Sequence, residues 1–194
     1  MPLVITKQRG IYRENVCLVI ANNRGDIFMG DIIPSHRSEI IPPHHFQMPQ
    51  GGIEPGETVV QAGWRELYEE TGLSAVSAKF LQENPTPLSY DFDMDHLPEN
   101  VQQEITRLGI KGQRQHFLLF ALINEQAISF NQFDPPEFKG YRFVSPDVAL
   151  DMVVPYKRDS YKQAFRFFAP TLNDMKKAVV FNTQTAIFHP QPAR

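Results

Sequence analysis

The stretch GGIEPGETVVQAGWRELYEETGL, residues 51–73, carries five glutamates and determines how the rest of the chain is interpreted. Glu66, Glu69 and Glu70 have the spacing i, i+3 and i+4, which places them close together on one helix. Like charges at these spacings destabilise a helix by about 0.2–0.5 kcal/mol per pair. They also lie toward the C-terminal end of the expected helix, where the helix dipole disfavours anions. A bound cation would relieve both conflicts.

The sequence marks both ends of this helix. Thr58 and Gln61 form a capping-box pattern, and Gly72 is a suitable C-terminal stop, so a helix is expected over residues 58–71. Apolar residues at i, i+4 and i+7 predict its buried stripe: Val60, Trp64 and Leu67. The three glutamates are expected on a different face of the helix. Arg65 can reach Glu69 at i+4, but one arginine does not neutralise three carboxylates.

Two interpretations of the acidic face are open at this point. A solvated acidic surface is the simpler one. Against it stand the helix dipole and the preceding glycine-rich turn GGIEPGE, which brings backbone close to the carboxylates. Clustered oxygen ligands on a rigid element suit Mg²⁺ or Mn²⁺. We therefore expect a divalent-metal site.

The same residues resemble a complete Nudix box. Gly51 is followed after five residues by Glu57, and after seven more by RELYEETGL at 65–73. The resemblance implies an α/β fold, an α/β/α sandwich with a mixed sheet and a glutamate-bearing loop–helix–loop. It also implies an enzyme that hydrolyses a nucleoside diphosphate linked to another moiety. The implied ligands of Mg²⁺, with Mn²⁺ as an alternative ion, are Glu66, Glu69, Glu70 and the carbonyl oxygen of Gly51. Arg65 would orient the glutamates, and Glu57 would brace the loop.

Further segments resemble the bacterial RNA pyrophosphohydrolase and dinucleoside polyphosphate hydrolase subfamily, over roughly residues 10–170. They are FQMPQGG at 46–52, KGQRQHFLLFAL at 111–122, PPEFKGYRFV at 135–144 and VVPYKRDSY at 153–161. The similarity implies that Glu137 is an additional metal ligand or base. It implies these substrate-binding residues: Arg13, Tyr90, Arg114, Tyr156 and Lys157. Lys157 would lie near the substrate phosphates, and the ring of Tyr156 against a base.

The chain also departs from these relatives. The stretch SYDFDMDHLPENVQQE at 89–104 is acidic, and no Lys or Arg occurs from Phe80 to Thr106. Negative charge there repels a polyphosphate backbone and argues against an extended RNA track on that side. The loop at 31–46 is longer and lacks the paired arginines found near there in the subfamily.

Three functions are therefore weighed. The leading one is a Mg²⁺-dependent hydrolase that trims 5′-triphosphate ends of RNA, cleaves dinucleoside polyphosphates, or does both. The second restricts the substrate to small nucleotides such as diadenosine polyphosphates, NADH or nucleoside diphosphate sugars. The third is a catalytically silent domain that senses nucleotides. The complete set of Arg65, Glu66, Glu69 and Glu70 argues against the third.

The remaining sequence predicts one globular domain of ordinary composition. Hydrophobic residues make up 42% of the 194 residues. Buried strands are expected at 16–21, 116–123 and 141–144, and residues 73–81 are expected to be extended. Helices are expected at 157–168, ending before Pro170, and at 175–180. We expect a Nudix domain at 1–170 and a tail at 171–194 that packs on the domain or is partly loose.

The first of these helices has two contrasting faces. Its apolar face is Tyr161, Ala164, Phe165 and Phe168. Its polar face is Lys157, Arg158, Lys162 and Arg166.

Composition limits the location of the protein and its partners. The net charge of −3 gives no overall attraction to nucleic acid or membrane, so an anionic ligand must be held locally. Cys17 is the only cysteine, which excludes an intramolecular disulfide, and its apolar context predicts a buried residue. The longest apolar run, at 117–123, is too short to span a membrane as a helix. We expect a cytoplasmic protein whose partner is a nucleotide or an RNA 5′-end.

Overall fold

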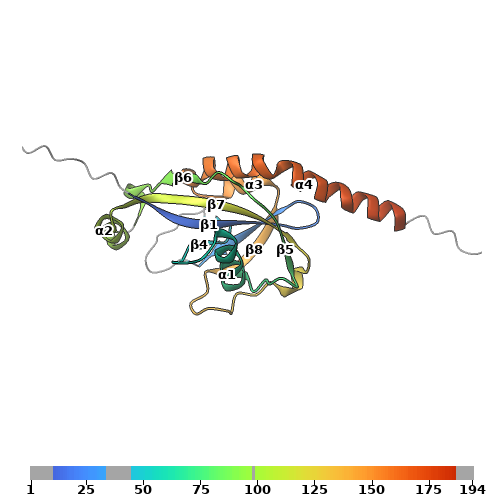
Figure 1. The fold of residues 1–194 in the computed structure, drawn as a ribbon, viewed down its shortest axis with the longest axis horizontal. Helices are drawn as coiled ribbons and strands as arrows, with labels where there is room; N and C mark the ends of the chain where they lie inside the picture. Colours follow the sequence, from blue (N-terminus) through green and yellow to red (C-terminus); the bar gives the residue numbers. More distant parts are fainter. Residues whose placement is uncertain (1–10, 34–44, 98, 187–194) are drawn as a thin grey trace, which may run out of the picture.

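A central mixed sheet with helices on both faces organises the computed structural model, which describes residues 11–33, 45–97 and 99–186 (Figure 1). The strands are β1 (Ile11–Ala21), β2 (Ile27–Ile32), β3 (Phe46–Gln47), β4 (Gln50–Gly52), β5 (Ala78–Glu83), β6 (Leu88–Asp91), β7 (Ile110–Leu122) and β8 (Phe138–Val144). The helices are α1 (Val59–Thr71), α2 (Glu99–Leu108), α3 (Pro146–Met152) and α4 (Arg158–Ala186). Short 3₁₀ turns lie at Met94–His96, Glu125–Ala127 and Pro155–Lys157.

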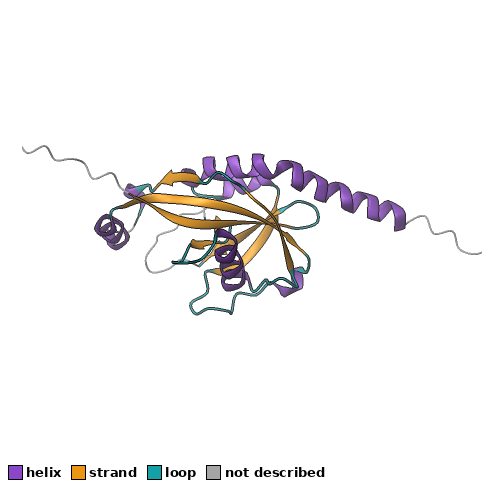
Figure 2. Ribbon diagram, in the orientation of Figure 1, coloured by secondary structure: helices purple, strands orange, loops and turns teal. Residues whose placement is uncertain are grey.

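The two longest strands form the middle of the sheet. β1 pairs with β7 in parallel, with Asn15 opposite Gln115 and Cys17 opposite Phe117. The strand order is β3-β2-β1-β7-β5, and β4, β6 and β8 pair with β1, β7 and β2, respectively. These other pairings are antiparallel, so the sheet is mixed, as expected (Figure 2).

Each face of the sheet has its own apolar core. Alternate residues of β1 and β7 point to opposite faces, which divides the core into two clusters. On the α1 side the buried residues include Val16, Leu18, Leu67, Leu118 and Phe120. On the α3–α4 side they include Cys17, Val19, Phe117, Tyr161 and Phe168. The α/β/α sandwich is confirmed.

The ends of α1 lie where the sequence places them. The Thr58 side chain accepts a hydrogen bond from the Gln61 N–H, and the Gln61 side chain accepts one from the Thr58 N–H, so the capping box is complete. Gly72 adopts φ 70° and donates its N–H to the Tyr68 carbonyl. Both features depend on residues within one turn of the helix end, which is why the sequence predicts them.

The buried face of α1 differs from the predicted stripe. Ala62 and Gly63 are fully buried beside Leu67, whereas Val60 and Trp64 are only half-buried. A side chain at Gly63 would collide with Leu118, so this glycine lets the helix approach the sheet closely. The face of α1 that packs on the sheet therefore includes Ala62, Gly63 and Leu67, and Glu66 is buried beside it.

Glu66 is accordingly 7% exposed. The expected separation of the three glutamates from the buried face of the helix therefore does not hold for Glu66. Burial of an ionisable group requires compensating polar contacts.

The C-terminal helix also differs from the prediction. Its expected apolar face is buried, as Tyr161 and Phe168 show, but α4 continues through Pro170 to Ala186 without a break. A proline inside a helix costs about 3 kcal/mol. Burial of Leu172, one turn further along the same face, helps to offset that cost. The proposed boundary at residue 170 thus falls within one helix.

Several smaller expectations are corrected in the same way. β1 and β7 are longer than the predicted strands, β5 begins only at Ala78, and the acidic stretch contains β6 and most of α2. Most of the 31–46 loop and the last residues of the chain lie outside the described residues.

Cys17 is buried, as expected, and burial raises the pKa of its thiol to about 12. Among the described helices, none has both the length and the apolar character needed to cross a bilayer.

Candidate functional site

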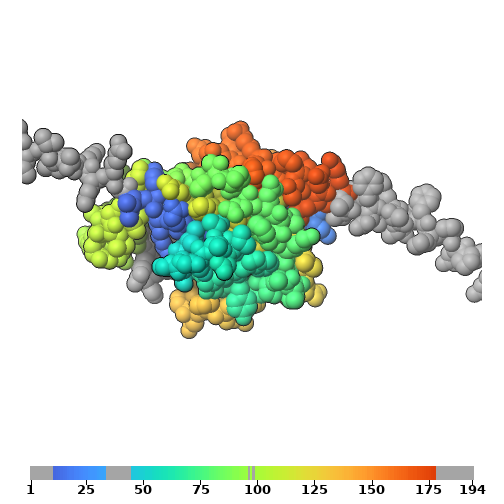
Figure 3. All heavy atoms as spheres, in the orientation of Figure 1, coloured from blue at the N-terminus to red at the C-terminus, as the bar shows by residue number. Residues whose placement is uncertain are grey.

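The box residues gather where α1 meets the short strand β4. β4 pairs with β1, with Gly51 opposite Val16, and the loop after it leads into α1. The Glu66 carboxyl lies directly against the Cα of Gly51, in the space that any larger side chain would fill. Only glycine at this position allows helix and strand to approach so closely. Figure 3 shows α1 and the preceding loop on the front of the molecule, with α4 across the top.

Arg65 connects the loop, the strand and the helix. Its Nε and Nη2 donate to the two carboxylate oxygens of Glu57 at 2.8 and 2.9 Å, and Nη2 also donates to the Gly52 carbonyl at 2.8 Å. Its Nη1 donates to Glu66 at 2.6 Å and to Glu69 at 3.1 Å. The guanidinium thereby fixes two of the three helix glutamates relative to β4.

Glu57 closes the loop before α1. Besides the two bonds from Arg65, its Oε2 accepts the Glu54 N–H at 3.0 Å. The bonds from Arg65 and then from the Glu54 N–H hold the pKa of Glu57 at about 2. The carboxylate therefore stays ionised throughout the physiological range, and the bracing of the loop that the sequence predicted is seen in the structure.

Glu70 contacts β4 one residue before Gly51. Its Oε2 accepts the backbone N–H of Gln50 at 3.0 Å. Burial raises its pKa well above the usual value, and the charges of Glu137 and Glu66 raise it further. Burial also raises the pKa of Glu66, although Arg65 opposes the shift. These carboxylates therefore repel one another in a partly desolvated place, which favours a cation between them.

Lys157 is the buried cation of the site. It is 6% exposed, so its assignment to the polar face of the helix, with Arg158, Lys162 and Arg166, was wrong. Its Nζ donates to Gln47 Oε1 at 3.1 Å and to Gln50 Oε1 at 3.2 Å. Burial lowers its pKa to about 8, against the attraction of Glu137 and Glu70. The lysine is thus held by neutral amides close to the acidic residues.

Two glutamines extend these contacts in opposite directions. Gln47 Nε2 donates to Glu137 Oε1 at 3.2 Å. Gln50 Oε1 also accepts from Gln115 Nε2 at 3.0 Å, and Gln115 donates to Asn15 at 3.1 Å. Glu137 remains exposed as a residue, but desolvation of its carboxyl raises its pKa, and Lys157 lowers it in part.

Sequence reasoning missed this amide network. Its members are Asn15, Gln47, Gln50 and Gln115. One signal was present: Gln113 and Gln115 alternate just before a buried apolar run, so both face the same side of the sheet.

Three predicted substrate-binding residues lie together at the start of α4. The ring centroids of Tyr90 and Tyr156 are 5.5 Å apart, and Lys157 Nζ is 5.9 Å from the centre of the Tyr90 ring. The Tyr90 hydroxyl donates to Gln113 at 2.6 Å. Tyr156 is half-buried and keeps part of its ring accessible.

The two predicted arginines lie on different faces of the sheet. Arg13 is exposed, and its guanidinium lies against Gly52, beside the loop that leads to α1. Arg114 is paired with Glu14 at 3.0 Å, and His116 contacts the same carboxylate at 2.9 Å. Strand alternation directs Arg114 to the face opposite Gln115. The structure therefore does not bring Arg114 together with Tyr90, Tyr156 and Lys157.

The donor set at this site is chemically suited to a divalent metal. Its members are carboxylates and a backbone carbonyl, the hard oxygen ligands that Mg²⁺ and Mn²⁺ prefer. In the described residues no three carboxylate, imidazole or thiol groups converge closely enough to hold an ion. The reason is visible in the contacts: Arg65 draws Glu66 and Glu69 one way, and the Gln50 N–H draws Glu70 another.

Comparison with known proteins identifies the family. Residues 11–164 match the NUDIX domain. An RNA pyrophosphohydrolase of Erythrobacter litoralis is 37% identical over 158 residues, which cover 81% of this chain and 90% of the relative. One of Yersinia enterocolitica is 36% identical over 168 residues, which cover 86% and 89%, respectively.

Solved structures agree on the fold. The Escherichia coli dihydroneopterin triphosphate pyrophosphohydrolase has a TM-score of 0.58 at 18% identity, covering 79% of this chain and 96% of that one. The Caenorhabditis elegans Ap4A hydrolase complex has a TM-score of 0.56 at 18% identity, covering 82% and 98%. The chain belongs to the NUDIX domain family and has the Nudix fold. It is a pyrophosphohydrolase, an enzyme that cleaves pyrophosphate bonds.

Proposed function

We propose that this enzyme is a Mg²⁺-dependent RNA pyrophosphohydrolase that removes pyrophosphate from 5′-triphosphorylated RNA, and that it also cleaves dinucleoside polyphosphates. The observation that carries the proposal is the buried Lys157 beside the carboxylates of Glu70 and Glu137, next to the box helix. The relatives named RNA pyrophosphohydrolase, at 36–37% identity over most of the chain, support this choice of substrate. We place its action in the cytoplasm.

The metal would be held by the oxygen ligands around β4. The proposed ligands of Mg²⁺, or of Mn²⁺ in its place, are Glu66, Glu69, Glu70, Glu137 and the carbonyl oxygen of Gly51. Bound divalent ions would polarise the phosphoryl oxygens and lower the pKa of a water molecule. Arg65 keeps Glu66 and Glu69 in position through the bonds described above.

The protein's own groups supply the base and the substrate contacts. Glu70 and Glu137 have raised pKa values, so either carboxylate is suited to accept a proton from the attacking water near neutral pH. Lys157 and Arg13 would bind the substrate phosphates. Tyr156, supported by Tyr90, would stack against a base, a contact of about 1–3 kcal/mol that tolerates any base. Arg114 would act only after leaving Glu14, so it is the weakest member of the proposed set.

A second candidate is hydrolysis of small nucleotides only. The acidic segment beyond β6 favours it, because α2 and the preceding turn contribute several carboxylates and little positive charge. Such a flank repels an RNA chain that runs across it.

An assay of phosphate release separates the candidates. Triphosphorylated RNA, diadenosine tetraphosphate and sugar nucleotides are each incubated with Mg²⁺ and the wild type or Glu137→Gln. We expect turnover of the first two substrates, a loss of at least about 100-fold in kcat for Glu137→Gln, and a Tm within a few degrees of wild type. Turnover of diadenosine tetraphosphate without RNA would establish the second candidate. An unchanged kcat in Glu137→Gln would remove Glu137 from the site.

A further inference from the structure

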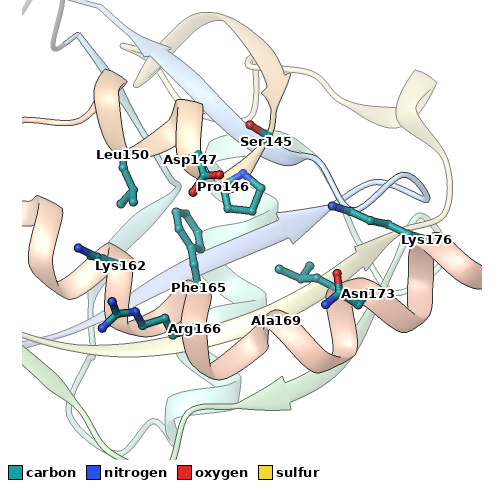
Figure 4. A pocket seen from close by; sticks show the side chains of 11 residues that line it. Ser145, Pro146, Asp147, Leu150, Lys162, Phe165, Arg166, Ala169, Asn173 and Lys176 are labelled. Atoms are coloured by element: carbon teal, nitrogen blue, oxygen red, sulfur yellow. The ribbon is translucent and has the colours of Figure 1, made fainter.

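A cleft between α3 and α4 lies outside the site described above. It has a volume of about 460 Å³ and opens to solvent. Its floor is apolar, with Pro146, Leu150, Phe165, Ala169 and Leu172 among the lining residues (Figure 4). Ligand pockets commonly have volumes of about 300–1,000 Å³. The cleft is therefore large enough for a group the size of a nucleotide.

The α4 wall of the cleft is positively charged. Lys162, Arg166 and Lys176 are exposed and line it, and Asp147 is the one acidic lining residue. Among the described residues, none of the three cations has a hydrogen-bond or ion-pair partner. By contrast, Arg158, just before the cleft, is bound to Asp151 at 3.1 Å and to the Leu150 carbonyl. Three unpaired cations on one helix face form a ready contact for an anionic chain.

The cleft is connected to the active site by the helix itself. Lys157 immediately precedes α4, and Lys162 follows five residues later. From Lys162 to Lys176 the helix rises about 21 Å, which gives the cations the length of several nucleotides. A strand that leaves the phosphate site along α4 would therefore meet these cations in succession.

The opposite exit from the site repels such a strand. Burial is the main cause of the raised pKa of Tyr156, and the carboxylate of Asp93 raises it further. Asp93 therefore lies close to that ring. Asp95, Glu99 and Glu104 follow on the segment that ends in α2. α2 and α4 extend toward opposite ends of the molecule (Figure 1). The field across the site therefore disfavours the α2 side and favours the α4 side.

We propose that the α3–α4 cleft binds the RNA downstream of the hydrolysed 5′-end. Phosphate groups of the single strand contact Lys162, Arg166 and Lys176, and one nucleotide enters the apolar floor. This inference rests on the proposed function, since it assigns a place to the body of that substrate. It places the RNA on the side of the site away from the acidic stretch at 89–104.

The test compares a cleft variant with a charge-matched control. The cleft variant is Lys162→Glu, Arg166→Glu and Lys176→Glu. The control is Lys79→Glu, Arg107→Glu and Lys177→Glu, three exposed cations outside the cleft, which change the net charge equally. Binding of 5′-hydroxyl RNA of about 4 and about 20 nucleotides is measured by fluorescence anisotropy against KCl concentration.

We expect the cleft variant to bind the longer RNA at least about tenfold more weakly than the control at low salt. For the cleft variant, the slope of log K against the logarithm of the salt concentration should be shallower by about 2. Three phosphate contacts are lost, and each contributes about 0.7 for single strands. Hydrolysis of diadenosine tetraphosphate should be the same in both variants, which shows that the active site is intact.

Two different failures can be told apart. If the wild type hydrolyses triphosphorylated RNA but both variants bind the longer RNA equally, the cleft assignment is overturned and the function stands. If the wild type hydrolyses no triphosphorylated RNA of either length, the proposed function is overturned, and the assignment of the cleft to that substrate falls with it. Binding of an acidic peptide that depends on the three cations, without any effect on RNA, would make the cleft a protein-binding surface instead.

Discussion

Lys157 is a buried cation whose surroundings change its acidity strongly. Its ammonium group is surrounded by amide oxygens and by ionised or ionisable carboxyls, and burial lowers its pKa from 10.5 to about 8. The charge of Lys157 can therefore be titrated without unfolding the protein. A solvent-exposed lysine that contacts phosphate would stay charged over the same pH range.

This shift predicts the pH dependence of substrate binding. Below pH 8 the ammonium is charged and attracts the phosphates, whereas above it the charge is lost, so KM should rise as the pH increases through about 8. A dinucleoside polyphosphate probe does not contribute to this change, because its bridging phosphates have no proton that is released near that pH. Calorimetric binding of a non-hydrolysable diadenosine polyphosphate between pH 6.5 and 9.5 measures the effect.

Lys157→Met is the matched control. Its affinity should be low at every pH and should not fall further through pH 8. The folded-state pKa lies below the unfolded one, so the wild type should also gain stability relative to Lys157→Met as the pH rises from about 8 to 10.5. An equally steep fall of affinity in the variant would assign the titration to another group.

At the scale of elements, the sequence predicts what is local. The α1 caps are set by Thr58, Gln61 and Gly72, each within a turn of the helix end, and the structure confirms them. Pro170 shows the limit of local rules, since its breaking tendency is overridden by the packing of α4 on the sheet.

The amide network was unpredictable for a different reason. Gln50 is 65 residues from Gln115 and 107 residues from Lys157, and only the register of β1 with β4 and β7 brings them together. Three glutamines in three different strands carry no sequence pattern for a shared buried cluster. The three glutamates of α1 that we propose as ligands could be singled out from the sequence because they share one helix, whereas the residues that position Lys157 do not.

The network predicts a functional effect for Gln50→Leu. Leucine removes the oxygen that accepts from both Lys157 and Gln115, while the backbone N–H bond to Glu70 remains. Loss of a residue that orients the groups around a metal site typically costs about 10–100-fold in activity or metal affinity. We expect kcat/KM to fall within that range, mainly through KM.

Gln50→Glu tests whether the oxygen itself matters. It restores an acceptor and adds a charge beside Lys157, so it should recover part of the lost affinity and raise the pKa read from the pH dependence of binding. A merely structural role for Gln50 would instead lower the Tm of both variants and leave KM and the pH dependence unchanged.

At the scale of the whole molecule, the candidate site holds buried carboxyl groups that repel one another. Glu66, Glu70 and Glu137 are brought together by α1, β4 and the segment before β8, and burial raises the pKa of each carboxyl. A carboxyl whose folded-state pKa is raised destabilises the fold as pH increases from about 4.5 through the folded value. In the absence of a bound cation, these carboxyls therefore lower the free energy of unfolding near pH 7, and a divalent cation should reverse this.

The reversal predicts opposite effects of one substitution on stability. In EDTA, Glu70→Gln should have a higher Tm than the wild type, because it removes a desolvated, repelled charge and keeps an oxygen that can accept the Gln50 N–H bond. In Mg²⁺ at about 100 times the Kd, the wild type should gain about 2.7 kcal/mol, or roughly 5–10 °C for a chain of this size. Glu70→Gln should gain much less, so the order of the two Tm values should invert. Thermal unfolding of both proteins, with and without Mg²⁺, checks this. Equal responses of the two proteins to Mg²⁺ would exclude Glu70 as a ligand, independently of any activity assay.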